Sequence, residues 1–224
     1  MRHFYRFTTL VSAIALSCSA IAADIDATSY GYPIANPFEA TIASTPAAMR
    51  PAVPEIDTIN QDDYQLDLFP ERAKQLPDVY WAHTKLTYRL ARQEKAAPLI
   101  FVIAGTGATY DDSKPEFLKQ LFYGAGYHVV QISSPTTLAF MAGASTSATP
   151  GISTEDAEDL YRVMEAISAA HPELQVTDYN LTGYSLGALN AAFVSHLDES
   201  RKGFNFKRVL LINPSVNLYT SVSN

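Results

Sequence analysis

The stretch Asn180-Leu181-Thr182-Gly183-Tyr184-Ser185-Leu186-Gly187-Ala188-Leu189-Asn190-Ala191-Ala192 decides the fold of this chain. A short run typical of a buried strand, residues 179–182, leads into Gly-x-Ser-x-Gly, and an alanine-rich helical run follows directly. In this strand–turn–helix setting the two glycines permit a very tight turn, because a Cβ at either position would meet the neighbouring strand or helix. The pattern predicts that the Ser185 hydroxyl lies above a sheet edge, beside helical N–H groups that favour negative charge. The alternative interpretation is a glycine-lined turn that only packs a helix closely on a strand.

Composition and charge limit the classes of function. The chain has 224 residues, enough for one domain with a sizeable core, and a formal net charge of -7. The negative charge argues against binding to nucleic acid and against a basic membrane-surface protein. The histidines show no paired spacing and the sequence has a single cysteine, so we expect no metal site and no cofactor.

The first 22 residues have the pattern of a secretory signal peptide. Arg2, His3 and Arg6 precede an apolar run, residues 10–16, and small residues end in an Ala-x-Ala site. We expect cleavage between Ala22 and Ala23, and an address in the periplasm or outside the cell. The apolar run is too short for a transmembrane helix. A disordered hydrophobic tail is the alternative.

The one cysteine, Cys18, lies within this predicted leader. The mature chain would therefore contain no thiol, no disulfide and no cysteine ligand for a metal. The residues before Cys18 match a lipidation signal poorly. Removal of residues 1–22 takes away two arginines and no acids, so the net charge becomes -7 minus 2, which is -9.

The rest of the chain divides by composition into an arm and a domain. Residues 23–60 are rich in alanine, proline, threonine and serine without helical or strand periodicity, which predicts an extended N-terminal arm. Residues 61–224 alternate strand and helix patterns, which predicts a single α/β domain built on a doubly wound, mostly parallel sheet. The predicted strands are residues 64–69, 86–90, 99–104, 128–132, 179–182 and 207–213. The predicted helices are residues 114–122, 153–171 and 186–197.

Several of these strands have clear individual signatures. Residues 86–90 alternate apolar and polar side chains, as expected of an antiparallel strand near a sheet edge. Residues 99–104 are an unbroken apolar run of the kind buried on both faces, and residues 207–213, apolar from Val209 to Ile212, predict another buried strand. Residues 133–151 are mostly small and predict a long loop, in which Phe140 and Met141 either pack under the loop or line a pocket. The loops after parallel strands share one edge of the sheet, where ligands bind in such folds.

Taken together, Gly183–Gly187 and the loop Gly105-Thr106-Gly107 resemble the α/β-hydrolase superfamily. In that family the nucleophilic serine follows the fifth strand and a glycine-containing loop follows the third, and both spacings match. The resemblance implies that Ser185 is the nucleophile within the elbow Gly183, Tyr184 and Gly187. It implies that the backbone N–H of Leu186 and that of Thr106 or Gly107 stabilise an oxyanion. Its substrates would be small-molecule esters.

The same resemblance requires an acid and then a histidine after the serine. After Ser185 the chain offers only His196, with Asp198 and Glu199 as acids. At 1.5 Å per residue, His196 would lie ~16 Å along the helix from Ser185, too far to accept its proton. We therefore expect a sequence truncated after the sixth strand, whose C-terminal part would carry the triad acid and base.

Three functions remain from the sequence. The first is a serine hydrolase of the esterase or lipase type that acts through an acyl-enzyme. The second is a non-catalytic binding or accessory protein on the same scaffold. The third, a Rossmann-type nucleotide binder, is disfavoured because Tyr110 occupies the third glycine position of Gly-x-Gly-x-x-Gly.

Overall fold

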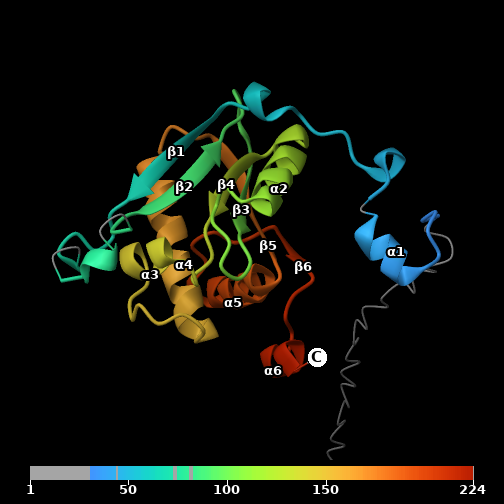
Figure 1. Cartoon of the computed structure of the whole chain (residues 1–224). Coiled ribbons are helices and arrows are strands. Elements are labelled where there is room, and N and C mark those ends of the chain that lie inside the picture. The colour runs from blue at the N-terminus through green and yellow to red at the C-terminus, as the bar shows by residue number, and fades with distance from the viewer. Residues whose placement is uncertain (1–30, 44, 73–74, 81–82, 224) are drawn as a thin grey trace, which may run out of the picture. The chain divides into compact units, whose positions relative to one another are not determined.

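A computed structural model describes residues 31–43, 45–72, 75–80 and 83–223, which belong to two units divided between Arg50 and Pro51 (Figure 1). The predicted signal peptide and Cys18 lie outside the described residues. The sequence predicts an extended arm, but the described part of the arm contains helix α1 (Pro37–Ile42) and a 3-10 turn η2 (Ala47–Met49). The Asn36 side chain starts α1 by accepting hydrogen bonds from the N–H groups of Phe38 and Glu39.

The second unit is built on a six-stranded sheet with the order β1-β2-β4-β3-β5-β6 among the described residues. β1 pairs with β2 and β2 pairs with β4 in antiparallel fashion, whereas the pairs β4–β3, β3–β5 and β5–β6 are parallel. This mostly parallel sheet confirms the predicted fold class. The strands are β1 (Gln61–Leu66), β2 (Leu86–Ala91), β3 (Ala97–Ile103), β4 (His128–Ile132), β5 (Val176–Tyr184) and β6 (Arg208–Ile212).

Helices cover the two faces of the sheet unequally (Figure 1). On one face α2 packs on β3 and β4, and on the other face α3, α4 and α5 pack on the larger core. None of the described helices is long and apolar enough to cross a membrane. The helices are α2 (Ser113–Gly124), α3 (Leu138–Gly143), α4 (Ser153–Ala170), α5 (Leu186–Arg201) and α6 (Leu218–Ser223), with 3-10 turns η3 (Ile56–Thr58) and η5 (Asp78–Tyr80).

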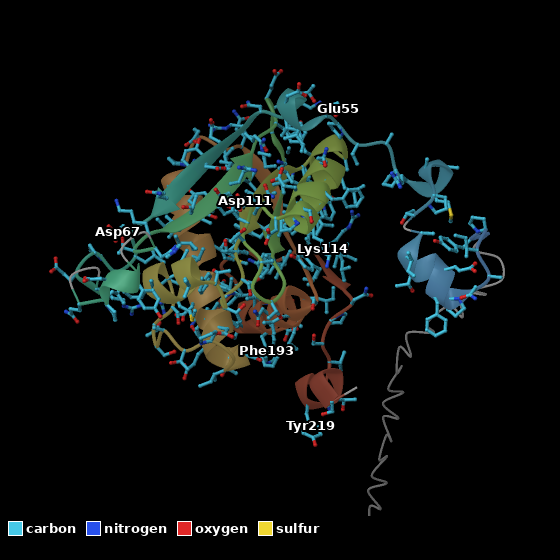
Figure 2. All side chains as sticks on the ribbon, in the orientation of Figure 1. Glu55, Asp67, Asp111, Lys114, Phe193 and Tyr219 are labelled. Atoms are coloured by element: carbon cyan, nitrogen blue, oxygen red, sulfur yellow. The ribbon has the colours of Figure 1, made fainter. Side chains whose placement is uncertain are left out.

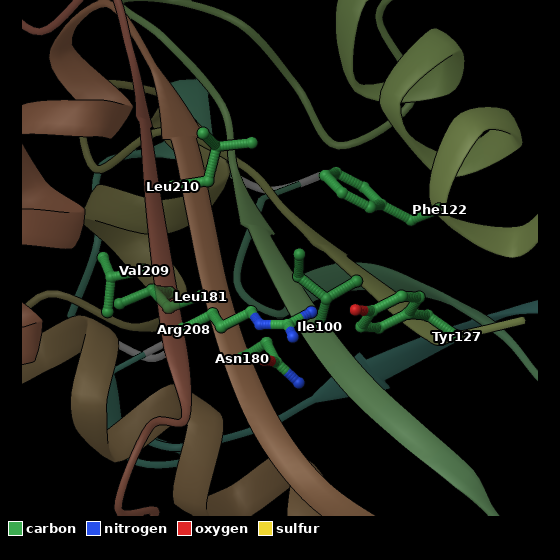
Figure 3. Close-up of a pocket in the computed structure, with 8 residues that line it drawn as sticks. All are labelled: Ile100, Phe122, Tyr127, Asn180, Leu181, Arg208, Val209 and Leu210. Carbon is green, nitrogen blue, oxygen red and sulfur yellow. The ribbon is translucent and has the colours of Figure 1, made fainter. Parts of the chain in front are cut away.

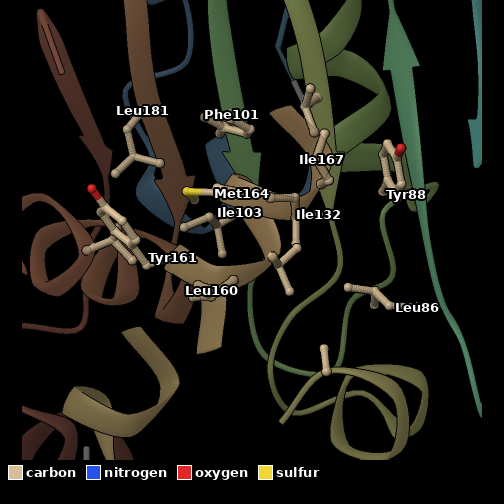
Figure 4. Packing of buried hydrophobic residues seen from close by; sticks show 14 of the residues in the cluster. Leu86, Tyr88, Phe101, Ile103, Ile132, Leu160, Tyr161, Met164, Ile167 and Leu181 are labelled. Atoms are coloured by element: carbon tan, nitrogen blue, oxygen red, sulfur yellow. The ribbon is translucent and has the colours of Figure 1, made fainter. Parts of the chain in front are cut away.

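β3 is the central strand, and its apolar run is explained by burial on both faces. Leu99, Phe101 and Ile103 point into the larger core with α4 and α5, where Leu160 and Met164 also pack (Figure 4). Ile100 and Val102 point the other way, toward α2. Because successive side chains of a strand alternate between faces, an unbroken apolar sequence is what this position requires.

The register of the parallel strands brings the predicted functional loops to one edge. Ile103 pairs with Ile132 of β4 and with Gly183 of β5, so these three strands end at the same level. The loops that begin at Ala104, Ser133 and Ser185 therefore leave the sheet side by side, at its carboxyl edge.

Two local predictions differ from the structure. The stretch 133–151 is not a loop throughout, because it contains α3, in which Phe140 is fully buried in the core and Thr137 caps the helix. The last strand, β6, is not buried on both faces. It lies at the edge of the sheet, and Leu210 and Leu211 remain 49% and 38% exposed.

Candidate active site

Ser185 lies in the one-residue turn between β5 and α5. Its backbone has φ 55° and ψ -123°, a conformation that residues other than glycine rarely adopt. Two backbone hydrogen bonds hold this conformation. The Ser185 N–H donates to the Ile212 carbonyl at 2.9 Å, and the Ser185 carbonyl accepts from the Ala188 N–H at 3.0 Å. Such strain persists only where surrounding contacts fix the backbone, and it is concentrated at functional sites. The Ser185 side chain is exposed.

The two glycines of the turn are required by space. A Cβ on Gly183 would lie 2.2 Å from the carbonyl oxygen of Gly187, within the turn itself. A Cβ on Gly187 would lie 2.3 Å from the carbonyl oxygen of Ile103 and 2.5 Å from that of Ala104. These are backbone atoms that cannot turn aside, so the sharp turn and the close contact between α5 and β3 both depend on glycine.

The loop after β3 lies directly against this turn. A Cβ on Gly105 would meet the Tyr184 ring at 2.7 Å, so the backbone of the loop passes over the residue that precedes the serine. Thr106 and Gly107 follow, both exposed, and Gly107 has a φ of +69°. The structure therefore brings the two predicted groups of oxyanion donors together, Leu186 from α5 and residues 106–107 from the loop.

The start of α5 supplies the electrostatic character of the site. Leu186 is the first residue of the helix, and N–H groups at a helix start have no carbonyl partner one turn earlier. The sixteen-residue helix places the positive end of its dipole here, and its first turn carries no acidic side chain. A developing negative charge beside Ser185 would be favoured.

A serine on a strained turn between strand five and a helix, beside a glycine loop after strand three, is the arrangement of an α/β-hydrolase sheet. The chain has an α/β-hydrolase-like fold.

Known structures that match this fold include several esterases, at low sequence identity. They include brefeldin A esterase, described as a bacterial homologue of human hormone-sensitive lipase, at 15% identity and a TM-score of 0.49. A hyperthermophilic esterase from the archaeon Pyrobaculum calidifontis matches at 18% identity and 0.46. A thermostable carboxylesterase cloned from a metagenomic library matches at 19% and 0.47.

The matches cover 78%, 70% and 76% of this chain and 47%, 45% and 50% of those proteins, respectively. The chain thus spans about half the length of the structures that it resembles. No protein-family model matches the sequence, and no curated protein matches it.

In this hydrolase-like fold, none of the four described histidines hydrogen bonds to Ser185. His128, the buried first residue of β4, accepts the Gln93 N–H at Nδ1 (3.0 Å). His171 lies 2.7 Å from the Tyr88 hydroxyl through Nε2. Both lie toward the amino ends of the parallel strands, because His128 pairs with Leu99 near the start of β3 and His171 precedes the start of β5.

The two remaining histidines make no described contact with Ser185 either. His196 is exposed on α5, and its Nδ1 lies 3.2 Å from a Glu199 oxygen in the next turn of the helix. His83 lies in the segment before β2, where its backbone N–H donates to the Tyr80 carbonyl.

Asp198, one of the two acids between Ser185 and β6, has a structural role. It is buried and accepts hydrogen bonds from the Tyr161 hydroxyl at 2.7 Å and from the N–H groups of Phe204 and Phe206 at 3.0 and 3.1 Å. Burial by itself would raise the pKa of Asp198, but these donors outweigh burial and hold the pKa below its usual value. The carboxylate thereby ties the end of α5 to the loop before β6.

Two hollows lie on the α2 face of the sheet. One, of about 490 Å³, lies over the middle of β3, β5 and β6 and includes Phe122, Tyr127 and Leu210, but not Ser185 (Figure 3). The other, of about 440 Å³, reaches the carboxyl edge between α2 and the turn. Its lining comprises Ser113, Lys114, Phe117, Leu118, Tyr184 and Ile212.

The second hollow is the one that adjoins the candidate nucleophile, through Tyr184 and Ile212. Its walls are almost wholly apolar, and Lys114 in the first turn of α2 supplies the one cation of its lining (Figure 2). The Lys114 ammonium lies 5.5 Å from the centre of the Tyr184 ring, within reach of a cation–π interaction.

The residues that hold the glycine loop were not among those predicted from the sequence. Thr136 and Ser134, in the segment after β4, hydrogen bond to that loop at Gly107 and Ala108. Their signal was the cluster of hydroxyl side chains at residues 133–137, directly after a parallel strand and hence at the carboxyl edge.

Proposed function

We propose that this chain carries the nucleophile of a serine hydrolase of the esterase or lipase type, with Ser185 as that nucleophile. The observation that carries the proposal is the backbone of Ser185, held at φ 55° between β5 and the start of α5 with its side chain exposed. A strained serine at this place in the sheet has a known chemical use, and no packing role requires its hydroxyl.

The proposed reaction has two steps. The Ser185 Oγ bonds to the carbonyl carbon of an ester, the alcohol leaves with the proton of the hydroxyl, and the acyl group stays on Oγ. Water then attacks the same carbon, which releases the carboxylic acid and restores the hydroxyl. In both steps the carbonyl oxygen becomes negative, and the N–H of Leu186 with that of Thr106 or Gly107 would stabilise it.

A serine hydroxyl needs a base, and the base needs an orienting acid. Among the described residues no histidine hydrogen bonds to Ser185: the side chains of His128, His171 and His196 hydrogen bond elsewhere, as does Asp198. We therefore propose that the base and the acid lie outside these 224 residues, downstream of β6. The apolar hollow beside Tyr184 supports a small-molecule ester as substrate.

The same absence of a partner for Ser185 among the described residues favours a second candidate, a non-catalytic binding or accessory protein on a hydrolase-like scaffold. A fluorophosphonate probe, which reacts only with an activated serine, separates the two. The natural gene product should be labelled, and Ser185→Ala should not be labelled. The control Ser195→Ala, farther along α5, should be labelled like the wild type. A folded wild-type protein that resists the probe would favour the accessory protein.

We also propose that the protein is exported, with residues 1–22 removed and residues 23–60 forming an arm ahead of the hydrolase-like domain. The basic start, short apolar run and Ala-x-Ala site support this. N-terminal sequencing of the mature protein should begin at Ala23, and a retained Met1 would argue against export by cleavage.

A further inference from the structure

The loop that follows β4 holds the loop that follows β3. The Thr136 Oγ1 accepts the Gly107 N–H at 2.7 Å, and the Ser134 N–H donates to the Ala108 carbonyl at 3.0 Å. A third bond joins the Tyr110 N–H to Ser133 Oγ at 2.9 Å. The glycine loop is therefore fixed by a neighbouring loop at three successive places.

Thr136 is itself held in position. Its Oγ1 lies 2.8 Å from the Ser134 Oγ, and its backbone N–H donates to the same Ser134 oxygen at 3.3 Å. Ser134 is fully buried, and Thr136 is half-buried at the surface of the loop. A hydroxyl anchored on a buried partner has few alternative rotamers, so it can fix the peptide that donates to it.

This hydrogen bond distinguishes the two loop amides of the proposed oxyanion site, because only the Gly107 N–H is used by it. A backbone N–H carries one proton, and that of Gly107 is directed to Thr136. Gly107 also requires its positive φ of +69°, so the orientation of the Thr106–Gly107 peptide is set jointly by the glycine backbone and by Thr136. The neighbouring Thr106 N–H makes no hydrogen bond among the described residues and is available as a donor.

We propose that Thr136 is a positioning residue for the proposed hydrolase: its hydroxyl, supported by Ser134, takes the Gly107 N–H and thereby holds the Thr106 N–H as the loop donor to the oxyanion. The inference rests on the proposed function of Ser185. The proposal assigns a function to the Thr136 hydroxyl, 29 residues along the chain from Gly107 in the loop that it holds.

Thr136→Val tests the inference, because valine is β-branched like threonine but lacks the hydroxyl that accepts the Gly107 N–H. The natural gene product is assayed for ester hydrolysis, with active sites counted by the fluorophosphonate probe so that only folded enzyme enters kcat. We expect kcat per site to fall roughly 10–100-fold and KM to change by less than about threefold, since a misplaced donor affects the transition state more than the bound ester. Thr136→Ser should recover most of the loss. Thr177→Val, at the amino end of β5 and so far from the carboxyl edge, is the matched control.

Hydrogen exchange of the Gly107 amide provides a second, independent measurement. We expect faster exchange in Thr136→Val and near wild-type protection in Thr136→Ser. An active wild type with unchanged kcat in Thr136→Val, or with a higher kcat because the Gly107 N–H is released, would overturn the inference alone. A wild type that neither hydrolyses esters nor reacts with the probe, with a protected Gly107 amide, would overturn the proposed function and leave Thr136 a structural residue.

Discussion

A Cβ atom on Gly187 would lie 2.3 Å from the carbonyl oxygen of Ile103, because the first turn of α5 packs directly on the end of β3. This backbone-to-backbone contact fixes how far Ser185 lies from the loop that follows β3. Leu186 and Thr106 come from segments about eighty residues apart, and the pairing of β3 with β5 and the close packing at Gly187 hold those segments together.

Gly187→Ala should therefore destabilise the fold although alanine is the better helix former. The gain in helix propensity is about 1 kcal/mol, whereas the added methyl group must displace the backbone of β3. We expect a net loss of about 1–3 kcal/mol in the free energy of unfolding, measured by urea denaturation. Ser195→Ala, on the same helix, should stay within about 0.5 kcal/mol of the wild type. A Gly187→Ala protein as stable as the wild type would contradict the close packing.

Ser185→Gly should be more stable than Ser185→Ala. Neither variant has the hydroxyl, but only glycine adopts φ 55°, ψ -123° without steric cost. Strain of this kind costs about 1–3 kcal/mol, and the flexibility of glycine in the unfolded chain returns about 0.5–1 kcal/mol of it. Thermal unfolding of the two variants side by side measures the difference. If the alanine variant proves more stable, the strain at Ser185 has been overestimated.

Much of the fold could be predicted because its signals are local. The apolar run of β3 reports burial on both faces, and the glycines at 183 and 187 report the turn within five residues of sequence. The end of α5 could not be predicted in this way. The helix continues to Arg201, several residues past its predicted end, because Asp198 is held by Tyr161 and by residues after the helix.

Asp198→Asn should lower stability at neutral pH. The amide keeps one acceptor oxygen but turns an NH2 group toward a buried donor, at a cost of about 1–3 kcal/mol. The folded-state pKa of Asp198 lies below its unfolded value of about 3.9, so its stabilisation is present above that pH and is lost as the pH falls through the folded pKa. Urea denaturation at pH 7 and pH 3 should show the gap between wild type and variant narrowing in acid. A gap independent of pH would contradict the ionised carboxylate.

His128 should make the protein sensitive to mild acid. Burial lowers the pKa of His128, so the unfolded chain, with a histidine pKa of about 6.5, binds the proton more readily than the folded one. The free energy of unfolding therefore decreases as the pH falls below about 6.5, until the folded pKa is passed. The melting temperature followed from pH 7.5 to pH 5 should decrease less in His128→Gln than in the wild type. Equal slopes would assign the acid sensitivity to other groups.

Part of the candidate site could also be predicted from local sequence, and part depends on contacts between distant segments. Ser185 and its glycines could be found from a pentapeptide, and the loop at 105–107 from its place after a buried strand. Thr136 could not, because its bond to Gly107 spans 29 residues and depends on the adjacency of β3 and β4. The exposure of β6 was also beyond the sequence, since an apolar run is the same whether or not another element covers it.

The position of β6 has a practical consequence for the purified chain. Among the described strands β6 pairs only with β5, so the N–H and C=O groups of its outer side face outward next to partly exposed Leu210 and Leu211. An apolar strand open along one side is a template on which an extended segment of another molecule can align. Protein concentration, rather than temperature alone, will therefore govern how long such a sample stays monodisperse, and light scattering will register the onset of association.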